Sequence, residues 1–299
     1  MSTENTGRAQ SAEQAEWTDY ADPEGYDFDV LVVGGGPVGM LLAAELRIAR
    51  VRAVVLERLP ERTPHSKAFG LHARSLESLD RRGLVERFRD GARSWNNGHF
   101  AGLDEWVDFS TLDSTHAYAL LSEQTRTERL LEERAVEVTA EIRRGHEVTA
   151  VRQDADGAEA DVTGPDGAYT LRARYIVGCD GGRSLVRGAA GIGFPGTGGR
   201  VTARLSDVIL ADRENAPMGM ERTERGLLFC VPLDDTYHRV STFDFGADRE
   251  SRARSSPWTS SPPACTRSGA AISAPTRRAG SPSSPTPHAR PTATARAGS

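Results

Sequence analysis

Lysine is nearly absent from this 299-residue sequence, because Lys67 is the single lysine among its 37 basic residues. Cysteine is also scarce: three widely spaced residues argue against a disulfide framework and against a zinc site. The seven histidines show no metal-ligand spacing either. No apolar run reaches the roughly 18 residues of a membrane span, and residues 1–25 lack the apolar stretch of a signal peptide. We therefore expect a cytoplasmic protein without a membrane segment or a metal site.

Apolar side chains are missing above all from residues 251–299. This segment contains seven arginines and no acidic residue, with 11 Ser, 10 Ala, 8 Pro and 6 Thr, and it has no Leu, Val, Phe or Tyr. Such a composition cannot bury enough apolar surface to offset its ordering entropy. It also lacks the lysine clusters and interleaved aromatics of a nucleic-acid-binding tail. We expect disorder here and over residues 1–25, and no nucleic-acid partner.

The N-terminal part of the chain has the pattern of a strand–helix–strand unit. Residues 28–33 are a short β-branched run that ends in glycines, which predicts a buried parallel strand. Residues 37–50 have an apolar helical face, and residues 51–57 predict a second strand. Further on, the pattern predicts helices at 71–83 and 124–138 and strands at 147–151, 158–162, 169–173, 175–178, 227–231 and 240–245.

A glycine motif connects the first strand to its helix. Gly34, Gly36 and Gly39 match the pattern GxGxxG, which Pro37 and Val38 complete. The first glycine permits a tight turn, the second lets a pyrophosphate approach the backbone, and the third lets the helix pack closely on the strand. The helix N-terminus offers free N–H groups and a positive dipole end to the phosphates. The motif predicts a dinucleotide site, with a glycine turn that binds nothing as the alternative.

Glu57 closes the second strand, 18 residues after Gly39. A carboxylate at this point accepts hydrogen bonds from both ribose hydroxyls and repels a 2′-phosphate. The pocket therefore suits the ADP part of FAD or NAD and disfavours NADP. These residues alone do not separate FAD from NAD, so an NAD-dependent dehydrogenase stays open at this point.

A second motif separates the two cofactors. Residues 177–187 read Val-Gly-Cys-Asp-Gly-Gly-Arg-Ser-Leu-Val-Arg and connect a strand to a helix, about 140 residues after the first motif. They resemble the Asp-Gly fingerprint of flavoprotein aromatic hydroxylases with the p-hydroxybenzoate hydroxylase fold, for which an NAD dehydrogenase has no use. On the residues alone, Asp180 has a second interpretation as a helix N-cap.

The resemblance extends from about Asp27 to Asp248 and implies the architecture. We expect an α/β fold with a Rossmann-like FAD-binding domain over residues 26–199, to whose substrate side about 84–120 contributes. A β-rich substrate domain is represented by residues 200–250, and its C-terminal part is missing. Four stretches are similar to one branch of the family, the angucycline-type oxygenases that hydroxylate aromatic polyketides: residues 55–58, 98–103, 143–148 and 193–197.

The resemblance also implies roles for particular residues. Glu57 would bind the adenosine ribose, and Arg58 would lie along the adenine. Gln124 matches a glutamine that contacts the ribityl–phosphate region, although it could equally cap a helix. Lys67 stands where the family often has an arginine facing the flavin; it keeps the charge but loses the bidentate fork, and a solvated lysine is its alternative. Three more residues belong near the ribityl and pyrophosphate groups: Asp180, Gly181 and Arg183, the last with a surface arginine as its alternative.

The reaction that the resemblance implies is hydroxylation of a phenolic polycyclic substrate, an aromatic polyketide. NADPH would reduce FAD, and a flavin C4a-hydroperoxide formed with oxygen would deliver an electrophilic oxygen to the ring. NADPH would bind transiently, outside the GxGxxG pocket. No catalytic base is identifiable, and we expect a monomer or a weak homo-oligomer. The alternatives are an inactive flavin-binding remnant and, more remotely, an NAD-dependent dehydrogenase.

The C-terminal part of the chain departs from the family, which has a Gly-Asp fingerprint there and a long helix after it. If each codon from about Pro257 is read from its third base, permitted codon choices give three family-like strings in the family's order. They are V-D-E-L-A for 258–262, D-L-G-A-H-A-P-R-W-L for 272–281 and D-A-T-R-Q-A-D-R-Y-R-A-G-R-V for 286–299. We interpret the chain as a hydroxylase that is truncated and frameshifted after about residue 250.

The coding DNA tests this interpretation. We expect the shifted frame to stay open and to run into a Gly-Asp motif, because the three strings lead toward it in the family's order. Sequencing the gene and its downstream region from the codon of Gly246 is the measurement. An early stop codon in the shifted frame, or an open frame without that motif, would contradict the interpretation.

Overall fold

The computed structural model describes residues 25–64, 66–100, 103, 105–197, 201–216, 218–233, 235–245 and 293–296. These residues belong to two compact units. The first unit contains the residues up to Thr63 and Thr125–Pro195, and the second contains Pro64–Gln124 and the residues from Gly196 onward. The sequence predicted an insertion at about 84–120 in a discontinuous domain, whereas the second unit takes in residues 64–124. Residues 1–24 and most of 251–299, for which we predicted disorder, lie outside the described residues.

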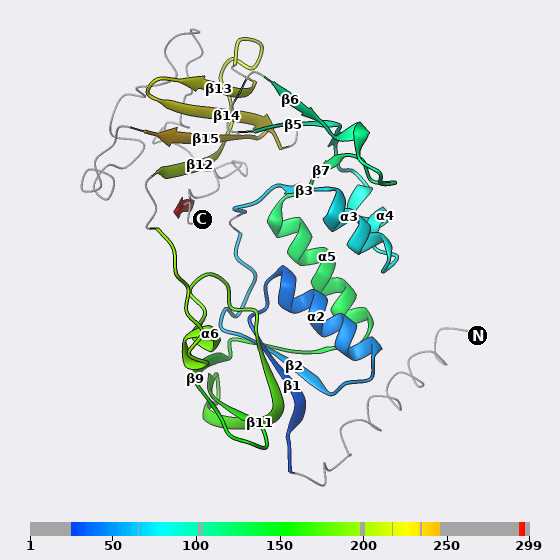
Figure 1. The fold of residues 1–299 in the computed structure, drawn as a ribbon, viewed down its shortest axis with the longest axis vertical. Coiled ribbons are helices and arrows are strands. Elements are labelled where there is room, and N and C mark those ends of the chain that lie inside the picture. Colours follow the sequence, from blue (N-terminus) through cyan, green and yellow to red (C-terminus); the bar gives the residue numbers. More distant parts are fainter. Residues whose placement is uncertain are drawn as a thin grey trace, which may run out of the picture. The chain divides into compact units, whose positions relative to one another are not determined.

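The first unit is built on a six-stranded sheet. Its elements are β1 (Phe28–Val33), α2 (Pro37–Ile48), β2 (Ala53–Glu57), α5 (Gln124–Glu137), β8 (Glu141–Arg144), β9 (Glu147–Gln153), β10 (Ala158–Gly164), β11 (Gly167–Gly178) and α6 (Leu185–Ala189). The strand order is β8-β2-β1-β11-β10-β9; β1, β2, β9 and β11 are labelled in Figure 1. β1 pairs in parallel with both β2 and β11, and β2 pairs in parallel with β8. The predicted strand–helix–strand unit is confirmed.

β11 is longer than the sequence predicted. We expected separate strands at 169–173 and 175–178, whereas the structure has one strand of 12 residues. Its first half pairs antiparallel with β10 and its second half pairs parallel with β1, and Ala173 takes part in both pairings. No turn-forming residue lies between Leu171 and Val177 to stop the strand. The antiparallel strands β9 to β11 are therefore continuous with the parallel part of the sheet.

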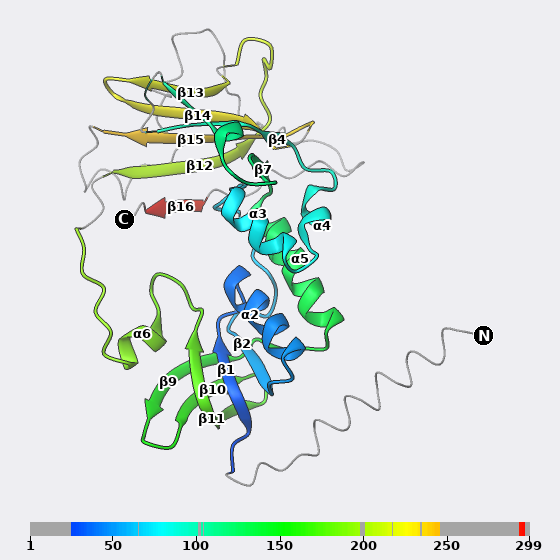
Figure 2. The same ribbon diagram turned by 45° about the vertical axis from the view of Figure 1, so that its right-hand side comes forward.

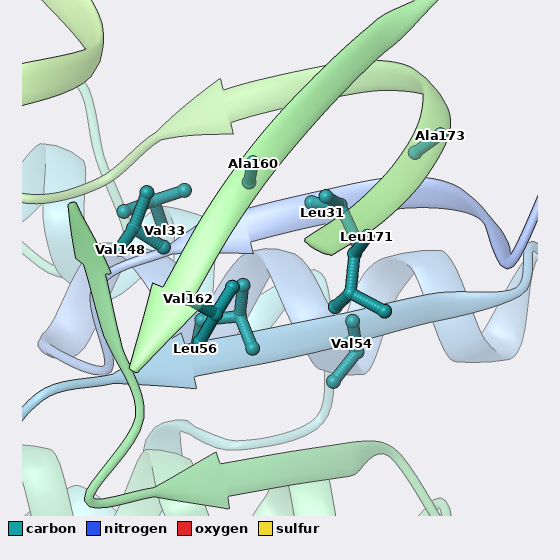
Figure 3. Close-up of a cluster of buried hydrophobic side chains, with 9 residues drawn as sticks. All are labelled: Leu31, Val33, Val54, Leu56, Val148, Ala160, Val162, Leu171 and Ala173. Atoms are coloured by element: carbon teal, nitrogen blue, oxygen red, sulfur yellow. The ribbon is translucent and has the colours of Figure 1, made fainter. Parts of the chain in front are cut away.

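The core of the first unit lies between the parallel strands and the antiparallel strands. Leu31 of β1 and Leu56 of β2 form one cluster with Val162 of β10 and Leu171 of β11 (Figure 3). Members of this cluster are at most 8% exposed, and burying each large aliphatic side chain stabilises the fold by about 1.5–3 kcal/mol. Alternation directs Val32 to the other face of the sheet, which α2 covers (Figure 2). This packing fixes the C-terminal ends of β1, β2 and β11.

The second unit contains a five-stranded antiparallel sheet with the order β13-β14-β15-β12-β16 and two small sheets, β3-β7-β4 and β5-β6. The large sheet consists of β12 (Thr202–Val208), β13 (Gly219–Thr223), β14 (Gly226–Pro232), β15 (His238–Asp244) and β16 (Ala293–Arg296). The other elements are β3 (Gly70–Leu71), α3 (Ala73–Asp80), α4 (Val85–Arg89), β4 (Ser94–Trp95), β5 (Asn97–His99), β6 (Trp106–Asp108), a 3₁₀ turn (Phe109–Thr111) and β7 (Ala119–Leu121). One face of the large sheet packs Leu228, Cys230 and Val240 against Leu210.

The strand β16 lies within residues 251–299, for which the sequence predicted disorder. Ala293–Arg296 pair antiparallel with β12, with Ala293 opposite Leu205 and Arg296 opposite Thr202. Backbone hydrogen bonds at the edge of a sheet need no apolar side chain, so a segment with this composition can still add to an open edge. The remainder of 251–299 is not among the described residues, and its disorder stays a prediction.

None of the described helices is long and apolar enough to cross a membrane. Within the described ranges, no group of three or more His, Cys, Asp or Glu side chains is arranged to hold a metal ion.

Candidate cofactor-binding site

Two glycines of the first motif are required by the chain's own packing. Gly34 has a φ of +108°, and a Cβ built on it would lie 2.5 Å from the carbonyl oxygen of Cys179. A Cβ on Gly39 would lie 1.9 Å from the carbonyl oxygen of Gly34. Both separations are far below van der Waals contact, so a side chain at either position would push β1 away from β11 or α2 away from β1.

Gly36 differs from these two glycines because a Cβ there would meet nothing within 4 Å. It is the N-cap of α2, where no side chain caps the helix, and Pro37 follows it in the first turn. Val38 is 67% exposed in that turn. The described residues therefore leave open space beside uncapped N–H groups and the positive end of a 12-residue helix. This open cradle has the charge preference of an anion-binding site and so favours a pyrophosphate.

Glu57 holds the glycine loop in place. One carboxylate oxygen accepts a hydrogen bond from the Gly35 N–H at 2.6 Å, and the other accepts from the Leu59 N–H at 2.8 Å. The sequence predicted that this carboxylate binds a ribose, and the structure adds a role within the chain. A carboxylate oxygen has two lone pairs, so each retains acceptor capacity for a hydroxyl group. Arg58, the next residue, is exposed.

Asp180 lies between the end of β11 and the start of α6. One of its carboxylate oxygens accepts from the N–H groups of Leu185 and Val186, at 2.6 and 3.2 Å. Asp180 thus binds the first N–H groups of α6, but it is not the N-cap residue: that position belongs to Ser184, whose hydroxyl accepts from the Arg187 N–H at 2.9 Å. The other oxygen, Oδ1, is buried and has no hydrogen-bond partner among the described residues. Gly181 and Arg183 are exposed beside it.

The two motifs meet at the C-terminal ends of adjacent strands. The Cys179 N–H donates to the carbonyl of Val33 at 2.7 Å, directly before Gly34. The Asp-Gly motif and the glycine loop, far apart in the sequence, therefore lie side by side. In an α/β sheet, this carboxyl end of neighbouring parallel strands is where ligands bind.

Gln124 and Lys67 lie in the second unit. The Gln124 N–H donates to the Ser66 hydroxyl and to the carbonyl of Ala68, at 2.8 and 2.9 Å. Its side-chain oxygen accepts from the Ala68 N–H at 3.3 Å. Lys67 is exposed within this bonded segment. The structure therefore brings together two of the predicted cofactor residues, and it also involves Ser66, which the sequence did not single out.

A groove elsewhere in the first unit contains none of the predicted cofactor residues. It has a volume of about 920 Å³, and Tyr175, Ile176 and Val186 are among its lining residues. Residues 175–178 of β11 pair with β1 on one side, and no described strand pairs with their other side. Tyr175 is 68% exposed. The volume of this groove therefore does not indicate where the cofactor site lies in this unit. The backbone geometry of the two motifs indicates it instead.

The residues at the two motifs fit FAD. The open cradle at Gly36 offers space and uncapped N–H groups to a pyrophosphate, and the Glu57 carboxylate at the end of β2 keeps acceptor capacity for a hydroxyl group. The sequence pattern of the FAD binding domain family matches residues 27–268. The chain belongs to this family. The recognition made from the two motifs is thereby confirmed, and FAD is the cofactor that the family binds.

Named relatives narrow the branch of this FAD-binding family. A Streptomyces rimosus protein, 12-dehydrotetracycline 5-monooxygenase/anhydrotetracycline 6-monooxygenase, is 44% identical over 243 residues, which are 78% of this chain and 48% of the relative. Rifampicin monooxygenase from Streptomyces venezuelae is 46% identical over 218 residues, which are 71% of this chain and 45% of the relative. The chain spans about half the length of the curated relatives it matches.

Solved structures agree with this assignment. OxyS anhydrotetracycline hydroxylase from Streptomyces rimosus matches with a TM-score of 0.66 and 46% identity, over 73% of this chain and 45% of that one. CabE, an aromatic hydroxylase from angucycline biosynthesis, matches with a TM-score of 0.65 and 37% identity, over 86% of this chain and 46% of that one. The p-hydroxybenzoate hydroxylase fold and the similarity to aromatic polyketide hydroxylases are thus confirmed.

Gly36→Val should abolish FAD retention while the chain still folds. The branched side chain would occupy the open cradle, whereas the φ of −77° and the empty surroundings tolerate it in the chain itself. Quenching of flavin fluorescence measures the affinity, and circular dichroism measures folding. Gly188→Val is the matched control, because a Cβ at Gly188 also meets nothing within 4 Å.

Gly39→Ala should affect folding, in contrast to Gly36→Val. It should lower the unfolding temperature, because its Cβ would lie 1.9 Å from the Gly34 oxygen. An unchanged FAD affinity in folded Gly36→Val would contradict the assignment of the cradle.

The Cys179 thiol should react slowly with a thiol reagent at pH 8. Burial raises the pKa of this thiol, and the negative charge of Asp180 raises it further, so less thiolate is present. Asp180→Asn keeps an acceptor oxygen and removes the charge, which should lower the pKa and speed the reaction. A Cys265→Ser background leaves buried Cys230 as the internal control, slow in both chains. Equal rates with and without the Asp180 charge would refute this account of the pKa.

Proposed function

We propose that this chain carries the FAD-binding part of a monooxygenase that uses NADPH and oxygen to hydroxylate a phenolic polycyclic substrate. The main observation in support of this proposal is that the glycine loop and the Asp-Gly motif lie side by side at the C-terminal ends of β1 and β11. Its relatives, named as monooxygenases of anhydrotetracycline and rifampicin, support the reaction and an aromatic polyketide as the substrate class. When bound, FAD supplies the activation of oxygen for transfer to an aromatic ring.

We assign the binding roles as follows. The N–H groups at Gly36 and the start of α2 hold the pyrophosphate, with Pro37 and Val38 in the same turn. Glu57 accepts from the adenosine ribose, and Arg58 lies along the adenine. A further set contacts the ribityl and phosphate region or the flavin, on the strength of the family resemblance: Lys67, Gln124, Asp180, Gly181 and Arg183. These groups bind and orient the cofactor, and the fold around them excludes water from the reacting atoms.

NADPH is proposed as a transient co-substrate that binds outside the glycine cradle. The negative charge of Glu57 at the ribose position supports this, because it repels the 2′-phosphate that distinguishes NADPH from NADH. We further propose that the protein is cytoplasmic and that it is a monomer or a weak homo-oligomer. No residue is assigned as a catalytic base.

A flavin binder without hydroxylase activity is the second candidate. The observation in its favour is the second half of β11, whose residues 175–178 have no described strand on one side. Tyr175 is largely exposed at that edge. Oxygen transfer to a substrate needs a closed, dry site, because water and an open cleft divert the activated oxygen to hydrogen peroxide.

Product analysis separates the two candidates. The 299-residue chain, supplied with FAD, NADPH, oxygen and a phenolic polyketide such as anhydrotetracycline, should oxidise NADPH and release hydrogen peroxide without hydroxylated product. The frame-corrected chain should form that product. Mass spectrometry of the polyketide, NADPH absorbance and a peroxide assay are the measurements, with Gly36→Val as the flavin-free control. Stoichiometric product from the 299-residue chain would contradict the second candidate, and absence of FAD binding would contradict both.

A further inference from the structure

The second unit buries an ion pair in the middle of its large sheet. Arg239 of β15 is 1% exposed, and Asp207 lies directly opposite it on β12. The Arg239 Nε and Nη2 groups donate to the two carboxylate oxygens of Asp207 at 2.8 and 2.9 Å. This bidentate geometry holds the guanidinium in one plane. A buried ion pair carries a desolvation cost that an apolar pair of similar size avoids, so stability alone does not account for it.

The guanidinium of Arg239 lies over an aromatic ring. Its central carbon is 5.7 Å from the centroid of the Phe69 ring, a cation–π distance. The same ring is 5.5 Å from that of Phe229 on β14. Arg239 Nη1 is buried and has no hydrogen-bond partner among the described residues. The ion pair therefore fixes a platform on which Phe69 rests.

Phe69 ends a short segment that contains Lys67. We call residues 66–69 the Lys67 segment. The backbone N–H and carbonyl of Ala68 are both bonded to Gln124 of the same unit, and the Ser122 N–H donates to the carbonyl of Phe69 at 2.9 Å. The segment thus has two anchors, the backbone bonds to residues 122–124 and the Phe69 ring on the sheet. Lys67 directly precedes both anchors and is exposed.

We propose that Arg239 and Asp207 are positioning residues for the Lys67 segment and act through Phe69. They hold the ring on the sheet, and the ring limits where the backbone that follows Lys67 can lie. This proposal rests on the proposed function, in which Lys67 and Gln124 contact the cofactor. Neither Arg239 nor Asp207 is required to touch the cofactor or the substrate.

Hydrogen exchange tests the positioning without the cofactor. In Arg239→Met, the amides of Ala68, Ser122 and Gln124 should exchange faster, because the platform under Phe69 is lost. Phe69→Leu should give the same local change, and it removes the ring without leaving a buried charge unpaired, so it serves where Arg239→Met does not fold. Unchanged exchange at these amides in both folded variants would overturn the inference.

Variants on the opposite face of the sheet control for a general loss of stability. Leu228→Val and Leu228→Ala remove apolar contacts from the cluster with Leu210, and together they bracket the loss of thermal stability in Arg239→Met. Neither should change exchange at Ala68 or Gln124 at a temperature where the chain is folded. Equal acceleration in a stability-matched Leu228 variant would show a general loosening and would refute a positioning role.

FAD affinity then links the segment to the cofactor. Arg239→Met should weaken FAD binding roughly tenfold. The double variant Arg239→Met/Lys67→Met should bind FAD almost as well as Lys67→Met alone, because both substitutions remove the same contact, that of Lys67 with the cofactor. Additive effects would contradict coupling through Lys67. If the unmodified chain binds no FAD, the proposed function fails, while the exchange measurement still decides the positioning role.

Discussion

The first unit depends on the close approach of two backbones, at Gly34 and Cys179. The N–H of Cys179 bonds to Val33, and the Cys179 carbonyl lies where a side chain at position 34 would be. Only a glycine permits this approach, because its backbone has a positive φ and it has no Cβ. The approach brings the glycine loop and the Asp-Gly motif to one edge of the sheet. Both motifs owe their common location to this contact rather than to either sequence pattern.

Two carboxylates beside that contact serve the chain before they serve any ligand. Glu57 holds the N–H groups of Gly35 and Leu59, and Asp180 holds those at the start of α6. These bonds order the two loops in advance, so less conformational freedom has to be lost when a cofactor binds. Asp180 also keeps one buried oxygen without a described partner. The same side chains are thus structural in the chain, and the proposed function gives them a second role toward a dinucleotide.

The second unit divides the faces of its sheet between two kinds of interaction. One face carries the apolar cluster of Leu228, Cys230 and Val240, which supplies burial. The other carries Arg239, paired with Asp207 and placed against Phe69. Alternation along each strand makes this division possible, because neighbouring residues point to opposite faces. Packing and polar positioning therefore occur at adjacent residues without interfering.

Local patterns in the amino-acid sequence determined much of this protein by themselves. Glycine spacing, β-branched runs and helical periodicity predicted β1, α2, β2, α5 and most of β14 and β15, because these signals act over a few residues. The resemblance carried by the two motifs identified the family. The Asp207–Arg239 pair and the platform under Phe69 were not predictable, since they depend on strand register and on contacts between residues far apart in the chain. The continuity of β11 and the bonds of Glu57 to the glycine loop were likewise decided only by the tertiary structure, which sets the partners available to each backbone and carboxylate group.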